Sequence, residues 1–200
     1  MILDLLFPKQ CLECKRKGKY ICKSCLNKVA VGGWYNGNYS IFRYEGIIRK
    51  AIISLKYKFA YDLSDELSLV IINKLKNINF SFKNVVLVPI PLYIRRENWR
   101  GFNQSEIVGE KIAKNMKCKY SPNLLIKNKK TDPQVNLRGI DRHKNQSGVF
   151  VVNTTYRFLP LNCSLILFDD VYTTGSTMLE AKKTLKEAGF KKVYSLTIAH

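Results

Sequence analysis

The sequence has 200 residues, of which 46% are hydrophobic and 24% are charged, which is enough for one full domain and a small appendage. Those figures exclude a disordered chain and a chain that needs disulfides to hold a core. The 34 lysine and arginine residues exceed the 15 acidic residues by 19, so we expect an anionic partner such as nucleic acid, a membrane surface or a phosphorylated small molecule. A lysine-rich composition that only solvates the surface explains the general excess equally well.

The first apolar stretch gives no sign of export. Residues 2–7 contain Asp4 and stop at Pro8, which makes the stretch too short for a secretion signal or a membrane span. We therefore expect a cytoplasmic protein with no membrane partner. In that compartment closely spaced cysteines bind metal more often than they form disulfides.

Four of the six cysteines form two C-x-x-C pairs, Cys11 with Cys14 and Cys22 with Cys25. Four thiolates complete a tetrahedral zinc site and leave no position for water, so the predicted zinc is structural rather than catalytic. A disulfide and a redox C-x-x-C are the alternatives. We predict a zinc-binding knuckle over residues 1–33 and a second domain over residues 34–200.

Basic and aromatic side chains surround this knuckle. The basic ones could face a nucleic-acid backbone or a protein partner: Lys9, Lys15, Arg16, Lys17, Lys19, Lys23 and Lys28. The aromatic residues Trp34, Tyr35 and Tyr39 could stack bases. Packing as the hydrophobic core of the knuckle is the favoured explanation for them.

The middle of the chain alternates between helix and strand patterns. After a glycine-rich link, weak alternation predicts a strand over residues 39–44, and apolar residues at helical spacing predict helices over 47–57 and 63–76. The continuous apolar run at 85–88 is typical of a strand covered on both faces. Asn103 with Glu106 three residues later is a capping signature for a further helix.

The remainder repeats the same alternation. Strands are predicted at 123–126, 150–152, 165–168 and 193–198, with a long polar loop after the first and a helix over 177–188. Together with the preceding elements, this pattern predicts an α/β fold with a mostly parallel sheet flanked by helices.

The most informative segment covers residues 165–178, where a buried strand ends in two carboxylates and a hydroxyl-rich loop with one glycine begins a helix. Gly175 would let the backbone approach a ligand, and the helix would direct its positive end to the same place. Asp169 and Asp170 could accept hydrogen bonds from sugar hydroxyls or contact Mg²⁺ through water. A ribose 5-phosphate meets these demands together, whereas the alternative is a polar loop that only caps the helix.

This segment closely resembles the phosphoribosyl diphosphate (PRPP) motif of type I phosphoribosyltransferases, with four apolar residues, two acids and a Thr-Thr-Gly-x-Thr loop. The resemblance implies that Asp169 and Asp170 bind the ribose hydroxyls and that the 5-phosphate is held by Thr173, Thr174, Gly175, Ser176 and Thr177. It also implies a fold of the type I phosphoribosyltransferase kind.

Further residues make the chain similar to the ComF family of competence-associated, phosphoribosyltransferase-like proteins. They are Pro89-Ile90-Pro91, Arg95, Arg96, Arg100 to Gln104, Thr131, Gln134, Leu137, Arg142, Asn145 and Gly148 to Phe150. The four-cysteine knuckle completes the resemblance, which covers nearly the whole chain. Lys127 and Lys129 depart from it, because such proteins often carry arginine there.

The resemblance implies that Pro89, Ile90 and Pro91 begin the loop that holds the leaving diphosphate. Cations would neutralise that group from the following segment (Arg95, Arg96 and Arg100) and from a mobile loop (Lys129, Lys130, Arg138 and Arg142). Surface charge is the alternative for each of them. Cleavage at the anomeric carbon would depend on diphosphate stabilisation, Mg²⁺ and loop closure, without a covalent nucleophile.

The acceptor is not defined by the sequence. Purine-salvage relatives often carry an aspartate where this chain has Thr173, which disfavours hypoxanthine-like substrates. The sequence ends at His200, after the last predicted strand, so we expect any acceptor pocket to come from the N-terminal half.

Two functional hypotheses follow. The first is a Mg²⁺-dependent phosphoribosyltransferase that cleaves PRPP and acts in natural transformation. The second is a non-catalytic adaptor that binds PRPP or single-stranded DNA beside a helicase-type ATPase of the competence machinery. No G-x-x-x-x-G-K-[ST] motif occurs, so we do not expect the chain to power DNA movement itself.

Overall fold

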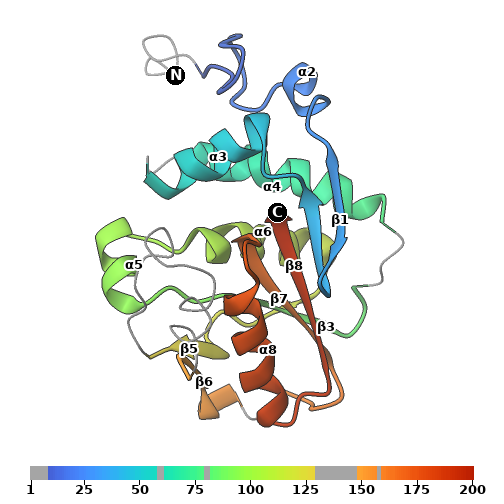
Figure 1. The fold of residues 1–200 in the computed structure, drawn as a ribbon, viewed down its shortest axis with the longest axis vertical. Helices are drawn as coiled ribbons and strands as arrows, with labels where there is room; N and C mark the ends of the chain where they lie inside the picture. The colour runs from blue at the N-terminus through green and yellow to red at the C-terminus, as the bar shows by residue number, and fades with distance from the viewer. Residues whose placement is uncertain (1–8, 58–60, 79–81, 129–147, 157–158) are drawn as a thin grey trace.

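The computed structural model describes residues 9–57, 61–78, 82–128, 148–156 and 159–200. A six-stranded sheet forms its centre, in the order β1-β2-β8-β7-β3-β4 (Figure 1). Its strands are β1 (Val31–Tyr35), β2 (Asn38–Phe42), β3 (Val85–Pro89), β4 (Lys119–Tyr120), β7 (Ser164–Val171) and β8 (Lys192–Ala199). Among the described strands of this sheet, only β1 and β2 pair antiparallel, so the predicted α/β fold with a mostly parallel sheet is confirmed.

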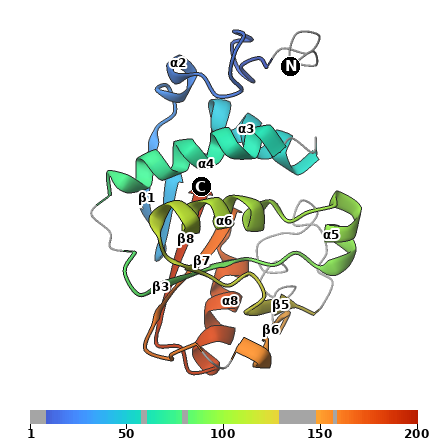
Figure 2. The same cartoon turned by 180° about the vertical axis from the view of Figure 1, so that it is seen from behind.

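Helices cover both faces of this sheet. The described helices are α2 (Lys23–Leu26), α3 (Gly46–Tyr57), α4 (Tyr61–Lys76), α5 (Ile94–Arg100), α6 (Gln104–Met116) and α8 (Ser176–Glu187). Figures 1 and 2, seen from opposite sides, show α4 and α6 on one face and α8 on the other. Among the described residues, no helix has both the length and the apolar character needed to cross a membrane.

The two inner strands are buried on both faces because their side chains alternate between two separate cores. Leu87 of β3 and Phe168 of β7 belong to the core beneath α3, α4 and α6. Val88 and Leu167, each one position away in sequence, belong to the core beneath α8. This alternation confirms the prediction that the continuous apolar run at 85–88 is a strand covered on both faces.

The structure corrects several sequence-based expectations. The glycine-rich link contains β1, an edge strand whose exposed Val31, Trp34 and Tyr35 carry no alternating apolar signal. The strands β5 (Leu125–Lys127) and β6 (Phe150–Val152) pair antiparallel in a small sheet of their own. Each of these strands has only three residues, and so short a pattern does not show from sequence which sheet a strand belongs to. Helix α5, strand β4 and the short 3₁₀ helix η2 (Thr154–Tyr156) were also not predicted.

The cysteine segment packs against the helices instead of standing apart. Cys11, Cys22, Cys25, Ile21 and Val29 lie in the same hydrophobic cluster as the buried side chains of α3 and α4. Polar contacts reinforce this packing: the Ile21 backbone N–H donates to Glu66 Oε2 at 3.0 Å. The predicted boundary between residues 33 and 34 lies inside β1.

Candidate sugar-phosphate site and cysteine cluster

Two adjacent carboxylates stand at the carboxyl end of β7. Asp169 and Asp170 are still part of this strand, which ends at Val171 and not at Phe168 as the sequence suggested. Asp170 is buried, with 6% of its surface exposed, and Asp169 is half-buried. The backbone N–H of Asp170 donates to Asp169 Oδ1 at 2.9 Å. We call these two residues the acid pair.

The first turn of α6 holds the acid pair. Ser105 Oγ donates to Asp169 Oδ1 at 2.8 Å, and Gln104 Nε2 donates to Asp170 Oδ2 at 2.7 Å. This turn is fixed by Asn103, the predicted N-cap, whose Oδ1 accepts from the Ser105 backbone N–H at 3.0 Å. The Asn103 amide also donates to the carbonyl of Ile90 at 3.0 Å, so one side chain joins α6 to the segment after β3.

Two cations approach the acid pair. Lys56, in the last turn of α3, places its Nζ atom 2.9 Å from Asp170 Oδ2. Arg100 Nη1 donates to Gln104 Oε1 at 3.3 Å and so reaches Asp170 through one amide. Burial would lower the pKa of Lys56, but the charge of Asp170 outweighs it and raises that pKa. Lys56 therefore stays charged at neutral pH.

Burial strongly affects the ionisation of Asp169. Burial first, and the negative charge of Asp170 second, raise the pKa of Asp169 to about 7. The hydrogen bonds from Ser105 and the Asp170 N–H, and the charge of Lys56, act in the opposite direction. Two neighbouring carboxyl groups, one of them with a raised pKa, form a site that favours a cation or several hydroxyl donors.

The loop between β7 and α8 has the geometry of an anion site. Gly175 is the N-cap of α8 and has a φ of +79°, a left-handed conformation that favours glycine. A Cβ atom at this position would lie 2.1 Å from the hydroxyl of Tyr172. Thr174 Oγ1 and Ser176 Oγ are 3.0 Å apart, and the first N–H groups of any helix lack partners within it. The arrangement therefore suits a phosphate group.

The structure brings most of the predicted site residues together. Pro89 lies opposite Phe168 in the sheet, and the N–H of Ile90 donates to the Phe168 carbonyl at 2.8 Å, so the end of β3 adjoins the acid pair. Pro91, which follows Ile90, is buried, whereas Arg95 on α5 is exposed. Predicted residues outside the described part of the chain are Lys129, Lys130, Arg138, Arg142 and the side chain of Arg96.

Three contacts to the acid pair were not assigned from sequence: those of Lys56, Gln104 and Ser105. Gln104 belonged to the segment that carries the resemblance, but nothing indicated its role. Lys56 follows an amphipathic helical pattern in which one lysine looks like any other. Only its ion pair with Asp170, on a strand distant in sequence, distinguishes it.

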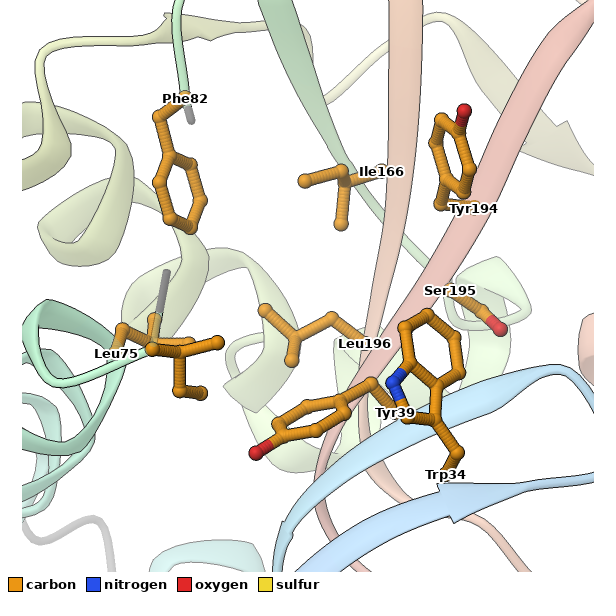
Figure 3. A pocket seen from close by; sticks show the side chains of 9 residues that line it. Trp34, Tyr39, Leu75, Phe82, Ile166, Tyr194, Ser195 and Leu196 are labelled. Atoms are coloured by element: carbon orange, nitrogen blue, oxygen red, sulfur yellow. The ribbon is translucent and has the colours of Figure 1, made fainter. Parts of the chain in front are cut away.

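An apolar pocket of about 80 Å³ lies away from the acid pair, between α4 and the middle of the sheet (Figure 3). It is lined by Trp34, Tyr39, Leu75, Ile78, Phe82, Ile166, Tyr194, Ser195 and Leu196. Trp34 contacts Tyr39 edge to face at 5.4 Å but is 67% exposed. The expectation that Trp34 and Tyr35 form the core of the knuckle is therefore wrong, because both are exposed on an edge strand.

The four predicted metal ligands converge. The sulfur atoms of Cys11, Cys14, Cys22 and Cys25 all lie within 4.8 Å of one another, with 3.5 Å between Cys11 and Cys22 and 3.7 Å between Cys14 and Cys22. Zinc–sulfur bonds of about 2.3 Å in a tetrahedron require sulfur separations of about 3.8 Å. The cluster could therefore hold a zinc ion.

The pKa values of these thiols differ within the cluster. Burial alone would raise the pKa of Cys11, but nearby backbone N–H groups, led by that of Cys14, lower it to about 6. Burial and the surrounding cysteines raise the pKa of Cys25 to about 12. Four thiolates can coexist here only with a cation between them.

Fold and site together define the class of this protein: a mixed α/β protein with a mostly parallel sheet, an acid pair and a glycine loop at the strand ends, and a four-cysteine cluster. No family model matches the chain. Its homologues include Competence protein F of Haemophilus influenzae, 30% identical over 107 residues, which cover 54% of this chain and 46% of the relative. Competence protein ComFC of Bacillus subtilis is 28% identical over 160 residues, which cover 76% and 59%.

A third homologue is the DNA utilization protein YhgH of Salmonella typhi, 30% identical over 103 residues, which cover 52% of this chain and 44% of the relative. The resemblance stated from the sequence is thus confirmed as homology to proteins with these names. The chain spans about half the length of the curated relatives it matches.

Among solved structures, the chain is similar to adenine phosphoribosyltransferases. The enzyme of Leishmania tarentolae gives a TM-score of 0.41 at 14% identity, covering 76% of this chain and 60% of that one. The enzyme of Leishmania donovani gives 0.40 at 14% identity, covering 85% and 62%. The fold class rests on the sheet topology described above.

Proposed function

We propose that the chain is a ComF-type, PRPP-binding protein of the phosphoribosyltransferase kind, which acts in DNA uptake during natural transformation. One observation carries the proposal. The acid pair at the end of β7 is followed, five residues after Asp170, by the left-handed Gly175 that begins α8. Paired acids offer acceptors to a sugar diol, and the helix start offers donors to a phosphate, at one edge of the sheet.

In this proposal, each part of PRPP has its own partner. The carboxylates of Asp169 and Asp170 accept hydrogen bonds from the ribose hydroxyls. The loop from Thr173 to Thr177 holds the 5-phosphate at the N-terminus of α8. The segment that begins at Pro89 holds the diphosphate, and Arg100 lies at the end of the helix that follows it.

The acid pair also suits magnesium, since carboxylate oxygens are its preferred protein ligands. When bound with PRPP, Mg²⁺ would neutralise the diphosphate. Catalysis would break the bond between the anomeric carbon and the diphosphate oxygen and form a bond from that carbon to the acceptor's nucleophilic atom, with positive charge developing on the ribose ring and the electron pair of the broken bond leaving with the diphosphate. The chain's own task is to orient the ribose and stabilise the departing anion with cations such as Arg100.

The role in DNA uptake is supported by the names of the relatives, two competence proteins and a DNA utilization protein. An alternative role is a non-catalytic adaptor that binds PRPP or single-stranded DNA beside a competence helicase. One observation favours it: Trp34 and Tyr35 are exposed on the edge strand of a chain with a net charge of +19, and exposed aromatic rings in a basic protein can stack bases.

Calorimetric titration with PRPP and Mg²⁺ tests the binding site. We expect binding by the unchanged protein and no binding by the double variant Asp169→Asn/Asp170→Asn. The matched control is Asp65→Asn/Glu187→Gln, which removes two exposed acids, 64% and 67% accessible, and should bind as the unchanged protein does. Equal binding by all three proteins would refute the site.

Pyrophosphate release from PRPP, measured across a panel of acceptors, separates the enzyme from the adaptor. Release that depends on one acceptor identifies a transferase and its substrate. Binding of PRPP without release supports the adaptor, and retardation of single-stranded DNA that weakens steeply between about 50 and 200 mM salt would show that the adaptor contacts DNA directly.

A further inference from the structure

Lys56 is the closest cation to the acid pair for which the structure gives a contact. It comes from α3, far in sequence from β7, and its Nζ atom lies 2.9 Å from Asp170 Oδ2. Its side chain is 21% accessible, against 9% for the side chain of Asp170. The ion pair is therefore largely shielded from water, where the attraction between charges is stronger than at the surface.

The Asp170 oxygen that Lys56 contacts also accepts a hydrogen bond from another side chain. Gln104 Nε2 donates to the same Asp170 Oδ2 at 2.7 Å. This oxygen thus has two partners. One is the Gln104 amide, which is held in place by the helix, and the other is the Lys56 ammonium group at the end of a flexible four-carbon chain. The amide comes from the first turn of α6, which Asn103 fixes, whereas the ammonium can withdraw by rotation of its own side chain.

Charge explains why a cation stands there. Two adjacent carboxylates repel each other, and removing the partner of a buried charge such as that of Asp170 is costly. Lys56 offsets one of the two negative charges. A ligand that brings its own Mg²⁺ makes that compensation unnecessary and requires the same oxygens.

We propose that Lys56 is the resident counter-cation of the acid pair, and that it is displaced from Asp170 when a Mg²⁺-bearing sugar diphosphate binds. This inference rests on the proposed function for the identity of the ligand. In the absence of ligand, Lys56 competes with bare divalent cations for the acid pair. The metal consequently enters together with the sugar diphosphate and not before it.

The test measures Mn²⁺ binding to zinc-loaded protein without PRPP, by electron paramagnetic resonance of the free ion. Lys56→Met should bind one Mn²⁺ at least about tenfold more tightly than the unchanged protein, because the competing charge is gone. Lys56→Arg keeps the charge and should bind as weakly as the unchanged protein. Lys50→Met is the matched control on the same helix: it removes a lysine paired with Glu13 at the surface and should have no effect.

The added ion must also be shown to sit on the acid pair. Adding Asp170→Asn to Lys56→Met should abolish the tight Mn²⁺ binding. Without metal, Lys56→Met should melt below the unchanged protein, and millimolar Mn²⁺ should restore its melting temperature. Equal Mn²⁺ affinity in Lys56→Met and the unchanged protein would overturn the inference.

A second readout separates displacement from direct ligand contact. If Lys56 is displaced, Lys56→Met should bind PRPP with Mg²⁺ at least as tightly as the unchanged protein, and complete loss of binding would overturn the inference. If the unchanged protein binds no PRPP, the proposed function fails. The Mn²⁺ comparison would still decide whether Lys56 is the counter-cation.

Discussion

Gly175 is the position at which the proposed phosphate loop should tolerate a side chain least. The perturbation is Gly175→Ala, which adds a single methyl group. Its φ of +79° lies in the left-handed region, and its Cβ atom would lie 2.1 Å from Tyr172 Oη and 2.5 Å from Tyr172 Cζ. The Tyr172 ring is buried and contacts Tyr35 edge to face at 5.9 Å, so it cannot move aside without losing packing.

The magnitude has two parts. A left-handed conformation costs an alanine about 1–2 kcal/mol, and forcing a buried ring out of a packed site costs about 1–3 kcal/mol. We therefore expect Gly175→Ala to lower the free energy of unfolding by about 2–5 kcal/mol. This is a large share of the about 5–15 kcal/mol typical of a folded domain.

The variant Gly37→Ala isolates the cost of the left-handed conformation. Gly37 has a nearly equal φ of +72°, but a Cβ atom there would meet nothing within 4 Å. Urea unfolding of the two variants should show Gly175→Ala to be the less stable by about 1–3 kcal/mol. Stabilities that agree within about 0.5 kcal/mol would refute the collision with Tyr172.

Two further predictions concern the surroundings of the acid pair. Burial and Asp170 raise the pKa of Asp169 from an ordinary 3.8 to about 7, so the stabilisation from its protonated form is complete below about pH 4 and is lost as the pH rises through about 7. In urea unfolding between pH 4 and 8, Asp169→Asn should flatten this decline, and an unchanged slope would contradict the assignment. Asn103→Ala should lower the free energy of unfolding by about 2 kcal/mol, since it removes an N-cap and leaves the Ile90 carbonyl without its donor. Chemical denaturation measures this loss, and a loss below about 0.5 kcal/mol would show that other groups replace both bonds.

The sequence predicted those parts of the fold whose signal is local. The apolar run at 85–88 and the strand before Asp169 show in sequence because both faces of each strand are buried. The helix after Asn103 is recognisable in the sequence because its N-cap hydrogen bond joins Asn103 to Ser105, two residues away. The cysteine cluster shows because two C-x-x-C pairs bring their own ligands together.

The sequence could not predict what depends on contacts between distant segments. Lys56 and Asp170 are separated by more than one hundred residues, and nothing near Lys56 distinguishes it from the other lysines. Similarly, β1 owes its place at the sheet edge to pairing with β2 and not to an apolar pattern of its own. Local patterns therefore located the acid pair and the proposed phosphate loop, whereas tertiary packing determined which side chains surround them.

The same packing links the cysteine cluster to α3, and this leads to a last prediction. Helix α2 has only four residues, too few to persist alone, so we expect a metal bound by the four cysteines to help hold residues 9–30 in place. The side chains of Ile21 and Val29 share one hydrophobic cluster with Ile48 and Leu55 of α3, and Lys56 directly follows Leu55. Removing zinc with a chelator should therefore expose this side of α3 as well as the cysteine segment.

Hydrogen exchange before and after chelation measures that coupling. We expect about one zinc per chain, and we expect chelation to speed exchange in residues 9–30 and in α3 while β3 and β7 stay protected in the centre of the sheet. Cys22→Ser should reproduce the effect without chelator, because Cys22 lies close to the sulfurs of both Cys11 and Cys14. Faster exchange confined to residues 9–30 would mean that α3 holds its position without the metal. In that case the cysteine segment would be an independent attachment to the helix that carries Lys56.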